Sequence, residues 1–152
     1  MEAVEINAGE FYLRQLRADD RIDDRPALVG GGLCPDLDAA GAHIAERARR
    51  WHADESCSWA VCDQLTGVAV GQVELAMTGE LTCWTTPELR GRGVATRAVA
   101  AVLRFGFGFL DLDRITARPP DDPGDAVTAA RRVAVKCGFV TEGPHPVWTR
   151  LR

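Results

Sequence analysis

The sequence lacks the cysteine patterns that mark a disulfide-stabilised or zinc-binding protein. Its five cysteines, at positions 34, 57, 62, 83 and 137, are odd in number, and no two of them form a CxxC pair. Such spacing is typical of neither a disulfide framework nor a zinc site. We therefore expect reduced thiols, no bound metal and a cytoplasmic location.

Long apolar runs and an excess of positive charge are also missing. The longest apolar stretch, FGFGFLDL, is far too short to cross a bilayer. The opening residues, MEAVEINAGEFYLRQLR, lack the basic segment and apolar core of a signal peptide. The formal net charge is −4 and the pI is about 5.4, so neither nucleic acid nor an anionic membrane is an expected partner.

What is present is the composition of an ordinary globular protein. Of the 152 residues, 46% are hydrophobic and 26% are charged, and there is no repeat, linker or biased tract. A chain of this length is large enough for its own hydrophobic core. We therefore expect a single domain over residues 1–152.

Hydrophobic periodicity predicts an alternation of strands and helices. Strands are expected at 11–17, 58–63, 67–75, 81–86 and 113–119, with one or two more between 139 and 152. Helices are expected over 36–52, from Gly93 onward and over 127–136. A meander followed by strand–helix–strand units predicts an α/β (α+β) fold, with a mixed, mostly antiparallel central sheet and helices on both faces.

Three features of the predicted helices can be checked directly. Apolar residues along the helix from Gly93 form one stripe, which predicts burial against a sheet: Val94, Ala98, Val102, Phe105, Phe109 and Leu112. Gly106 and Gly108 each weaken that helix by about 1 kcal/mol relative to alanine, which suggests close packing there. Gly138 stands where the left-handed cap of the helix 127–136 belongs.

A basic, glycine-rich junction contrasts with this acidic chain. The stretch PELRGRGVATRAV, residues 87–99, joins the predicted strand 81–86 to the helix from Gly93. Gly91 and Gly93 permit a sharp turn and the close approach of a ligand. The first amides of a helix have no partner inside it, so such a turn suits a phosphate or pyrophosphate group. A plain surface turn and an arginine–glycine patch for nucleic acid are the alternatives, and the low pI disfavours the second.

Three blocks around this junction resemble the GNAT superfamily of acyl-CoA-dependent N-acyltransferases. They are ELTCWTTPELRGRGVATRAVAAVLRFGF, LDRITARP and AARRVAVKCGFVTEG. Arg90-x-x-Gly93-x-Ala95 is similar to that family's R/Q-x-x-G-x-G/A loop. The likeness runs from about Phe11 to Glu142 and is greatest to the branch that contains the ribosomal-protein N-terminal acetyltransferases.

The resemblance implies a splayed sheet that grips the pantetheine arm of acetyl-CoA, or of another acyl-CoA, between two parting strands. The loop 90–95 would hold the pyrophosphate, and an amide of the strand Leu81–Thr85 would polarise the acyl carbonyl. An acceptor amine would approach from the side of the helix 36–52 and the last strands. The residues expected to bind the cofactor are Cys83, Trp84, Thr85, Arg90, Gly91, Arg92, Gly93, Val94, Ala95 and Thr96.

Acyl transfer to an amine also requires a group that accepts the amine proton. Glu80 and Glu74 are the catalytic candidates, with Glu80 preferred, and Glu88 is a weaker one. For each of them a solvated surface charge is the alternative reading. The strand cysteines, Cys83 among them, are expected to be small core residues rather than nucleophiles.

The proton donor that many members of the family use is not identifiable. The resemblance aligns the usual tyrosine with Ala134, the usual serine with Ala130, a common asparagine with Val127, and the glutamate after the loop with Arg97. The resemblance implies that the loop 90–95 binds pyrophosphate through its backbone, so these departures leave the pyrophosphate site intact.

The sequence therefore predicts an acetyl-CoA-dependent N-acetyltransferase that acts by direct transfer to an amine acceptor. A peptide N-terminus and a small-molecule amine are both possible acceptors. The alternative is a non-catalytic GNAT-like domain that binds CoA or a regulatory partner, which the missing hydroxyl groups favour. A homodimer is left open.

Overall fold

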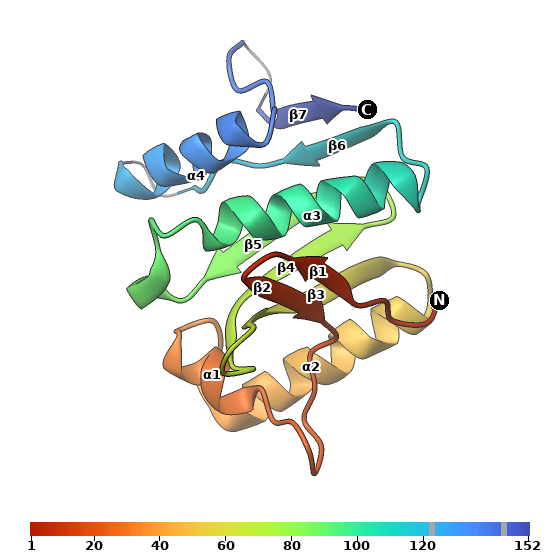
Figure 1. Ribbon diagram of the computed structural model, residues 1–152, viewed down its shortest axis with the longest axis vertical. Helices are drawn as coiled ribbons and strands as arrows, with labels where there is room; N and C mark the ends of the chain where they lie inside the picture. The colour runs from red at the N-terminus through yellow and green to blue at the C-terminus, as the bar shows by residue number, and fades with distance from the viewer. Residues whose placement is uncertain (122–123, 144–145) are drawn as a thin grey trace.

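The computed structural model describes residues 1–121, 124–143 and 146–152. Figure 1 shows the elements, which follow one another as β1 (Ile6–Ala8), β2 (Phe11–Arg14), α1 (Arg25–Gly30), α2 (Leu37–His52), β3 (Ser56–Asp63), β4 (Ala69–Ala76), β5 (Leu81–Thr85), the 3-10 turn η1 (Pro87–Leu89), α3 (Val94–Gly108), β6 (Arg114–Ala117), α4 (Asp125–Lys136) and β7 (Trp148–Leu151). β1 to β5 form an antiparallel sheet in chain order, and β6 pairs with β7.

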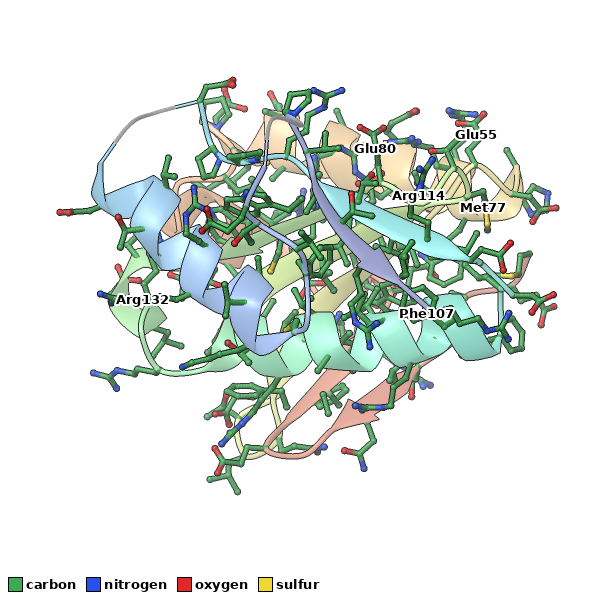
Figure 2. The ribbon with its side chains drawn as sticks, turned by 90° about the horizontal axis from the view of Figure 1, so that it is seen from above. Glu55, Met77, Glu80, Phe107, Arg114 and Arg132 are labelled. Atoms are coloured by element: carbon green, nitrogen blue, oxygen red, sulfur yellow. The ribbon has the colours of Figure 1, made fainter. Side chains whose placement is uncertain are left out.

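Helices cover both faces of the five-stranded sheet, as the sequence predicts, and Figure 2 shows α2 and α3 on opposite sides of the central strands. On one face, Val73 of β4 and Trp59 of β3 are buried with α3 residues such as Val102. On the other face, Ala60 of β3 packs with Ile44 of α2. The alternation of side chains along β3 and β4 supplies both layers, because successive residues point to opposite faces of a sheet. The expected fold class is confirmed.

The starts of the two long helices follow the sequence prediction. Asp36 caps α2 by accepting a hydrogen bond from the Ala39 amide at 2.8 Å. α3 begins directly after Gly93, whose φ of 82° lies in the left-handed region. Among the described residues, no helix combines the length and the hydrophobicity that a membrane span requires.

The predicted apolar stripe of α3 is confirmed only for its first part. Val94, Ala98, Val102 and Phe105 are buried. The helix ends at Gly108 and Phe109 is 62% exposed, so the prediction that the helical stripe continues beyond Gly108 is wrong, although Leu112 still packs against the core. The physical reason is a closing turn, in which the Leu112 amide donates to the Gly106 carbonyl at 3.0 Å.

Close packing at the α3 glycines is found at one of the two positions. A Cβ on Gly106 would lie 2.7 Å from Ile115 Cδ1 and 2.9 Å from Leu75 Cδ2. A Cβ on Gly108 would meet no atom within 4 Å. Gly106 therefore lets α3 approach β4 and β6, whereas Gly108 has no such role.

The N-terminal strand is shorter than predicted. β2 ends at Arg14 rather than Arg17, because Arg14 donates two hydrogen bonds of 2.8 Å to the carboxylate of Asp24. The Arg17 amide bonds the same carboxylate, so the chain between them folds away from the sheet. β1, which pairs with β2 through a tight turn, is not predicted by the sequence.

In the described C-terminal residues, 139–143 and 146–152, β7 is the one closing strand, and Val140 and Thr149 form an isolated bridge. Gly138 has a φ of 83° and follows α4 as predicted. His145, which the sequence places between two prolines, lies outside the described residues.

The two sheets touch at one end and then separate. Glu80 and Thr116 form a parallel bridge, and the Thr116 amide donates to the Gly79 carbonyl at 2.9 Å. Pro119 and Pro120 follow shortly afterwards. Because proline has no amide hydrogen, this segment cannot continue a ladder with β5. β5 is therefore left with a free edge.

Candidate active site

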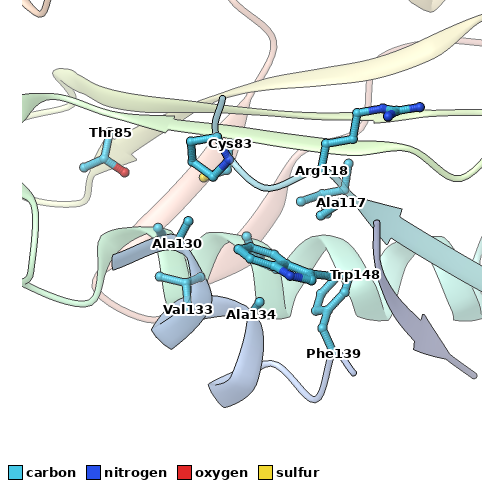
Figure 3. Close-up of a pocket in the computed structure, with 13 residues that line it drawn as sticks. Cys83, Thr85, Ala117, Arg118, Ala130, Val133, Ala134, Phe139 and Trp148 are labelled. Carbon is cyan, nitrogen blue, oxygen red and sulfur yellow. The ribbon is translucent and has the colours of Figure 1, made fainter. Parts of the chain in front are cut away.

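A cavity of about 170 Å³ lies where β5 and the segment after β6 separate (Figure 3). β5 forms one side, α3 lies beneath it, and α4 and β7 close the other side. The lining residues are Leu81, Cys83, Thr85, Ala95, Val99, Ala117, Arg118, Pro120, Ala130, Val133, Ala134, Phe139 and Trp148. Nearly all of these side chains are apolar, so the cavity suits the uncharged arm of a ligand.

The backbone of β5 directs alternate amides toward this cavity. The Thr86 amide donates to Val70 at 2.9 Å, and the Glu80 carbonyl accepts from Ala76 at 2.8 Å, so even-numbered positions face β4. In an antiparallel pair, the polar groups of the intervening residues point the other way.

Two contacts at the ends of β5 agree with this alternation. The Gly79 carbonyl accepts from the Thr116 amide, and the Thr85 carbonyl accepts from Arg90 Nε at 3.3 Å. Both carbonyls point away from β4. The amide of Cys83, at the middle of the strand, therefore faces the cavity side and has no strand partner there among the residues that the structure describes.

The loop before α3 presents a row of unpaired amides. Gly91 and Gly93 have φ values of 80° and 82°, which glycine adopts without strain. Within the described part of the chain, the amides of residues 91–96 have no recorded acceptor, and the first to bond is that of Arg97, to the Gly93 carbonyl at 3.1 Å. Amides that converge at the positive end of a 15-residue helix form a site for an anion.

Space for that anion is open. A Cβ built on Gly91 or on Gly93 would meet no atom within 4 Å. Thr85 and Ala95, at the two ends of the loop, also line the cavity. The anion site and the apolar cavity are thus adjacent, which is the arrangement that a ligand with a phosphate end and an uncharged arm requires.

The sequence-predicted cofactor residues divide between two faces of the sheet. Cys83, Thr85 and Ala95 line the cavity. The ring of Trp84 lies on the opposite face against Gly31, where an added Cβ would be 2.4 Å from Trp84 Cη2. Val94 is buried in the core, so it and Trp84 can serve a ligand in the cavity only through their backbones.

The candidate bases have different environments. Glu74 is 8% exposed and forms ion pairs with Arg47 at 2.8 Å and with Arg50 at 2.7 Å. Glu80 is exposed at the junction of the sheets, with its carboxylate 3.6 Å from Arg118 Nε. Figure 2 shows Glu80 on the side of the molecule where α2 lies. Its carboxylate is therefore more accessible to a substrate than that of Glu74.

Glu88, the third candidate base, is hydrogen-bonded within its own loop. Its carboxylate accepts a hydrogen bond from the Thr86 hydroxyl at 2.6 Å, which lowers the pKa of Glu88 below its usual value. A lowered pKa makes a carboxylate a weaker base.

The α4 wall of the cavity carries no hydroxyl group. Its lining residues are Ala130, Val133 and Ala134, and the first and last of these stand where the family resemblance places a serine and a tyrosine. Phe139 and Trp148 complete the wall and were not identified as site residues from the sequence. Apolar residues at the end of a chain are more simply read as core, so the sequence carries no clear signal for them.

The cysteines are poor nucleophiles. Burial raises the pKa of Cys57 to about 12 and that of Cys62 to about 11. Cys83 is exposed, but its open side faces the cavity, whose apolar walls raise the pKa of its thiol to about 12. At neutral pH these groups are thiols rather than thiolates.

The five-stranded sheet with its flanking helices is the fold of GNAT acetyltransferases. The family model for the acetyltransferase (GNAT) domain matches residues 8–140, and the chain belongs to that family. A comparison with curated proteins finds no match.

Several solved structures share the fold along nearly the whole chain. A Vibrio cholerae protein assigned as a ribosomal-protein-serine acetyltransferase has a TM-score of 0.81 at 20% identity, with 98% of each chain covered. The ribosomal-protein-S5-alanine acetyltransferase of Vibrio fischeri has a TM-score of 0.75 at 15% identity, covering 97% of this chain and 96% of that one. Mycobacterium smegmatis RimJ, solved in complex with CoA-disulfide, has a TM-score of 0.74 at 19% identity, covering 97% and 87%.

Proposed function

We propose that the protein is an acetyl-CoA-dependent N-acetyltransferase whose whole chain forms one catalytic domain. The observation that carries the proposal is the row of unpaired amides at residues 91–96 beside an apolar cavity. The loop amides would bind the pyrophosphate, with Arg90 and Arg92 adding positive charge nearby. The pantetheine arm would lie along the free edge of β5.

In the proposed reaction the acceptor amine attacks the thioester carbonyl directly. The Cys83 amide donates a hydrogen bond to the carbonyl oxygen as it gains negative charge. Glu80 accepts the proton that the amine loses, through a water molecule. The carbon–sulfur bond then breaks, the new amide bond remains, and the CoA sulfur leaves as a thiolate.

The departing thiolate receives little help from α4, since Ala130 and Ala134 offer no proton. A thiolate is a far better leaving group than an alkoxide or amide, so direct transfer remains feasible without a strong acid. Protonation of the sulfur by solvent completes the balance.

For the acceptor, we propose the amino group of a peptide N-terminus. The support is the fold shared with two structures that are described as ribosomal-protein acetyltransferases. A small-molecule amine is the second candidate. We place the reaction in the cytoplasm, where acetyl-CoA is available and where the five cysteines would stay reduced.

The test is product analysis with purified protein, isotopically labelled acetyl-CoA, a panel of N-terminal peptides and a panel of small amines. We expect label on the α-amino group of a subset of peptides. Binding of CoA with no transfer to any acceptor would favour the non-catalytic alternative. Absence of CoA binding would overturn the proposal altogether.

A further inference from the structure

The cavity beside β5 has an open end and a closed end. Thr85, Ala95 and Ala130 line it and are partly exposed. At the closed end the lining residues are only 3–6% exposed, and they are Leu81, Val99, Ala134, Phe139 and Trp148. Figure 3 shows Thr85 and Ala130 toward one side of the cavity, and Trp148 and Phe139 toward the other.

Three elements run from the open end to the closed end. Each contributes one partly exposed residue and one buried residue to the lining: Thr85 and Leu81 of β5, Ala95 and Val99 of α3, and Ala130 and Ala134 of α4. Four positions along the chain correspond to about 6 Å in a helix and about 13 Å in a strand. The cavity therefore has depth along β5, and its closed end lies toward the bridge at which the two sheets meet.

The loop before α3 sets the direction in which an acyl-CoA would enter. Its phosphates would bind at residues 91–96, beside the open end, so the arm would run inward along β5. The amide of Cys83, on the cavity side of the strand, would then meet the thioester carbonyl. Leu81 lies two residues further in, which is about 7 Å along a strand. That depth is more than the single methyl of an acetyl group fills.

The closed end is lined for a hydrocarbon chain. Its described side chains are aliphatic or aromatic, so they offer a chain dispersion contacts and a wall free of water. Arg118, the one charged residue of the described lining, has a side chain that is 70% exposed, and its guanidinium points outward in Figure 3. Ala134 ends at its Cβ, so it leaves room that a longer side chain would take.

We propose that this closed end is an acyl pocket for chains longer than acetyl, so that the protein binds propionyl-CoA and butyryl-CoA more tightly than acetyl-CoA. The inference rests on the proposed function and names the class of its donor. Ala134 is the specificity-determining residue, because its small side chain leaves space for the acyl chain. Transfer from these donors follows the same steps as transfer of an acetyl group.

The experiment measures binding by calorimetry with no acceptor present, so that it does not depend on transfer. The ligands are CoA, acetyl-CoA, propionyl-CoA and butyryl-CoA. The proteins are the unmodified chain, Ala134→Leu and the matched control Ala130→Leu, which adds the same side chain one turn nearer the open end. Ala134→Val adds a smaller side chain at the first position, and thermal melts establish which chains are folded.

In the unmodified chain we expect each methylene beyond acetyl to strengthen binding by about two- to fourfold, because it leaves water for an apolar wall. This gain should disappear in Ala134→Leu, shrink in Ala134→Val and persist in Ala130→Leu. Longer donors that bind the unmodified chain no better than acetyl-CoA would overturn the inference, and so would a full gain in the folded Ala134 variants. If CoA itself does not bind the unmodified chain, the proposed function fails instead.

Discussion

At the scale of single residues, the loop before α3 makes the sharpest prediction. Gly93→Glu would place a carboxylate beside the two phosphates of CoA. At an effective dielectric near 20, like charges ~4 Å apart repel by about 4 kcal/mol, which corresponds to a loss of affinity of about a thousandfold. Calorimetry with CoA measures the loss, and a thermal melt shows whether the fold survives.

The control for that change is Gly93→Ala. Both substitutions force a side chain onto a φ of 82°, so both carry the same backbone strain of about 1–2 kcal/mol. Only the glutamate adds charge. If Gly93→Glu binds CoA within about threefold of Gly93→Ala, the loop is not the phosphate site.

The two candidate bases can be separated by rate and stability together. Glu80→Gln should slow single-turnover transfer by about a hundredfold or more, because an amide cannot accept the proton that the amine loses. Its melting temperature should hardly change, since the side chain is exposed. Glu74→Gln should instead destabilise the fold by about 1–3 kcal/mol, because Arg47 and Arg50 lose their carboxylate partner.

The opposite pattern would reverse the assignment. Normal stability with lost activity in Glu74→Gln, and normal activity in Glu80→Gln, would make Glu74 the base. Full activity in both variants would exclude both residues.

Cys83 should form no acyl-enzyme intermediate although it lies in the cavity. A thiol pKa of about 12 leaves almost no thiolate at neutral pH. Intact-protein mass spectrometry after incubation with acetyl-CoA alone should show no stoichiometric adduct of one acetyl group. A hydroxylamine-sensitive adduct that disappears in Cys83→Ala would contradict direct transfer.

At the scale of elements, the two α3 glycines predict opposite effects of the same substitution. Gly106→Ala should lower the free energy of unfolding by about 1–3 kcal/mol, because its Cβ collides with the buried side chains of Ile115 and Leu75. Gly108→Ala should raise it by about 0.5–1 kcal/mol, because alanine favours the helix and its Cβ meets nothing. Urea denaturation measures the free energy of unfolding of each variant. Changes of the same sign in the two variants would contradict the packing described around α3.

The elements also show which parts of the structure a sequence can predict. The start of α2 at Asp36, the start of α3 after Gly93 and the turn at Gly138 depend on local chemistry, and the sequence predicts all three. The end of β2 depends on Arg14 meeting Asp24, and the pairing of Glu74 depends on arginines of α2. These partners are 10 and 24 residues apart for Arg14–Asp24 and Arg50–Glu74, which is beyond the three- or four-residue spacing that a local pattern reveals.

Part of the candidate site can likewise be predicted from local sequence, and part cannot. The loop at residues 90–96 has a recognisable spacing, because its glycines are required by the backbone conformation itself. Trp148 and Phe139 enter the cavity only because β7 returns beside β6 and α4. In the sequence alone, nothing distinguishes these two residues from other apolar residues.

At the scale of the whole molecule, ligand binding should join the two sides of the cavity, which share a core beneath α3 but whose two sheets pair at only one point among the described residues. Within the described residues, β5 and β6 share a single bridge, Glu80 to Thr116. We expect CoA at a hundredfold excess over its Kd to slow amide hydrogen exchange in β6, β7 and α4, by up to about a hundredfold. Protection confined to residues 91–96 would show that the ligand does not span the gap.

The free edge of β5 affects how readily the protein should aggregate. An unpaired strand edge is a template on which another chain can add a strand, and proteins usually guard such edges against aggregation. Here α4 and β7 close the far side of the cavity but leave the edge of β5 itself unpaired among the described residues. Under the proposed function a bound CoA arm would cover this edge, so we expect the ligand-free protein to aggregate faster than the CoA-bound protein.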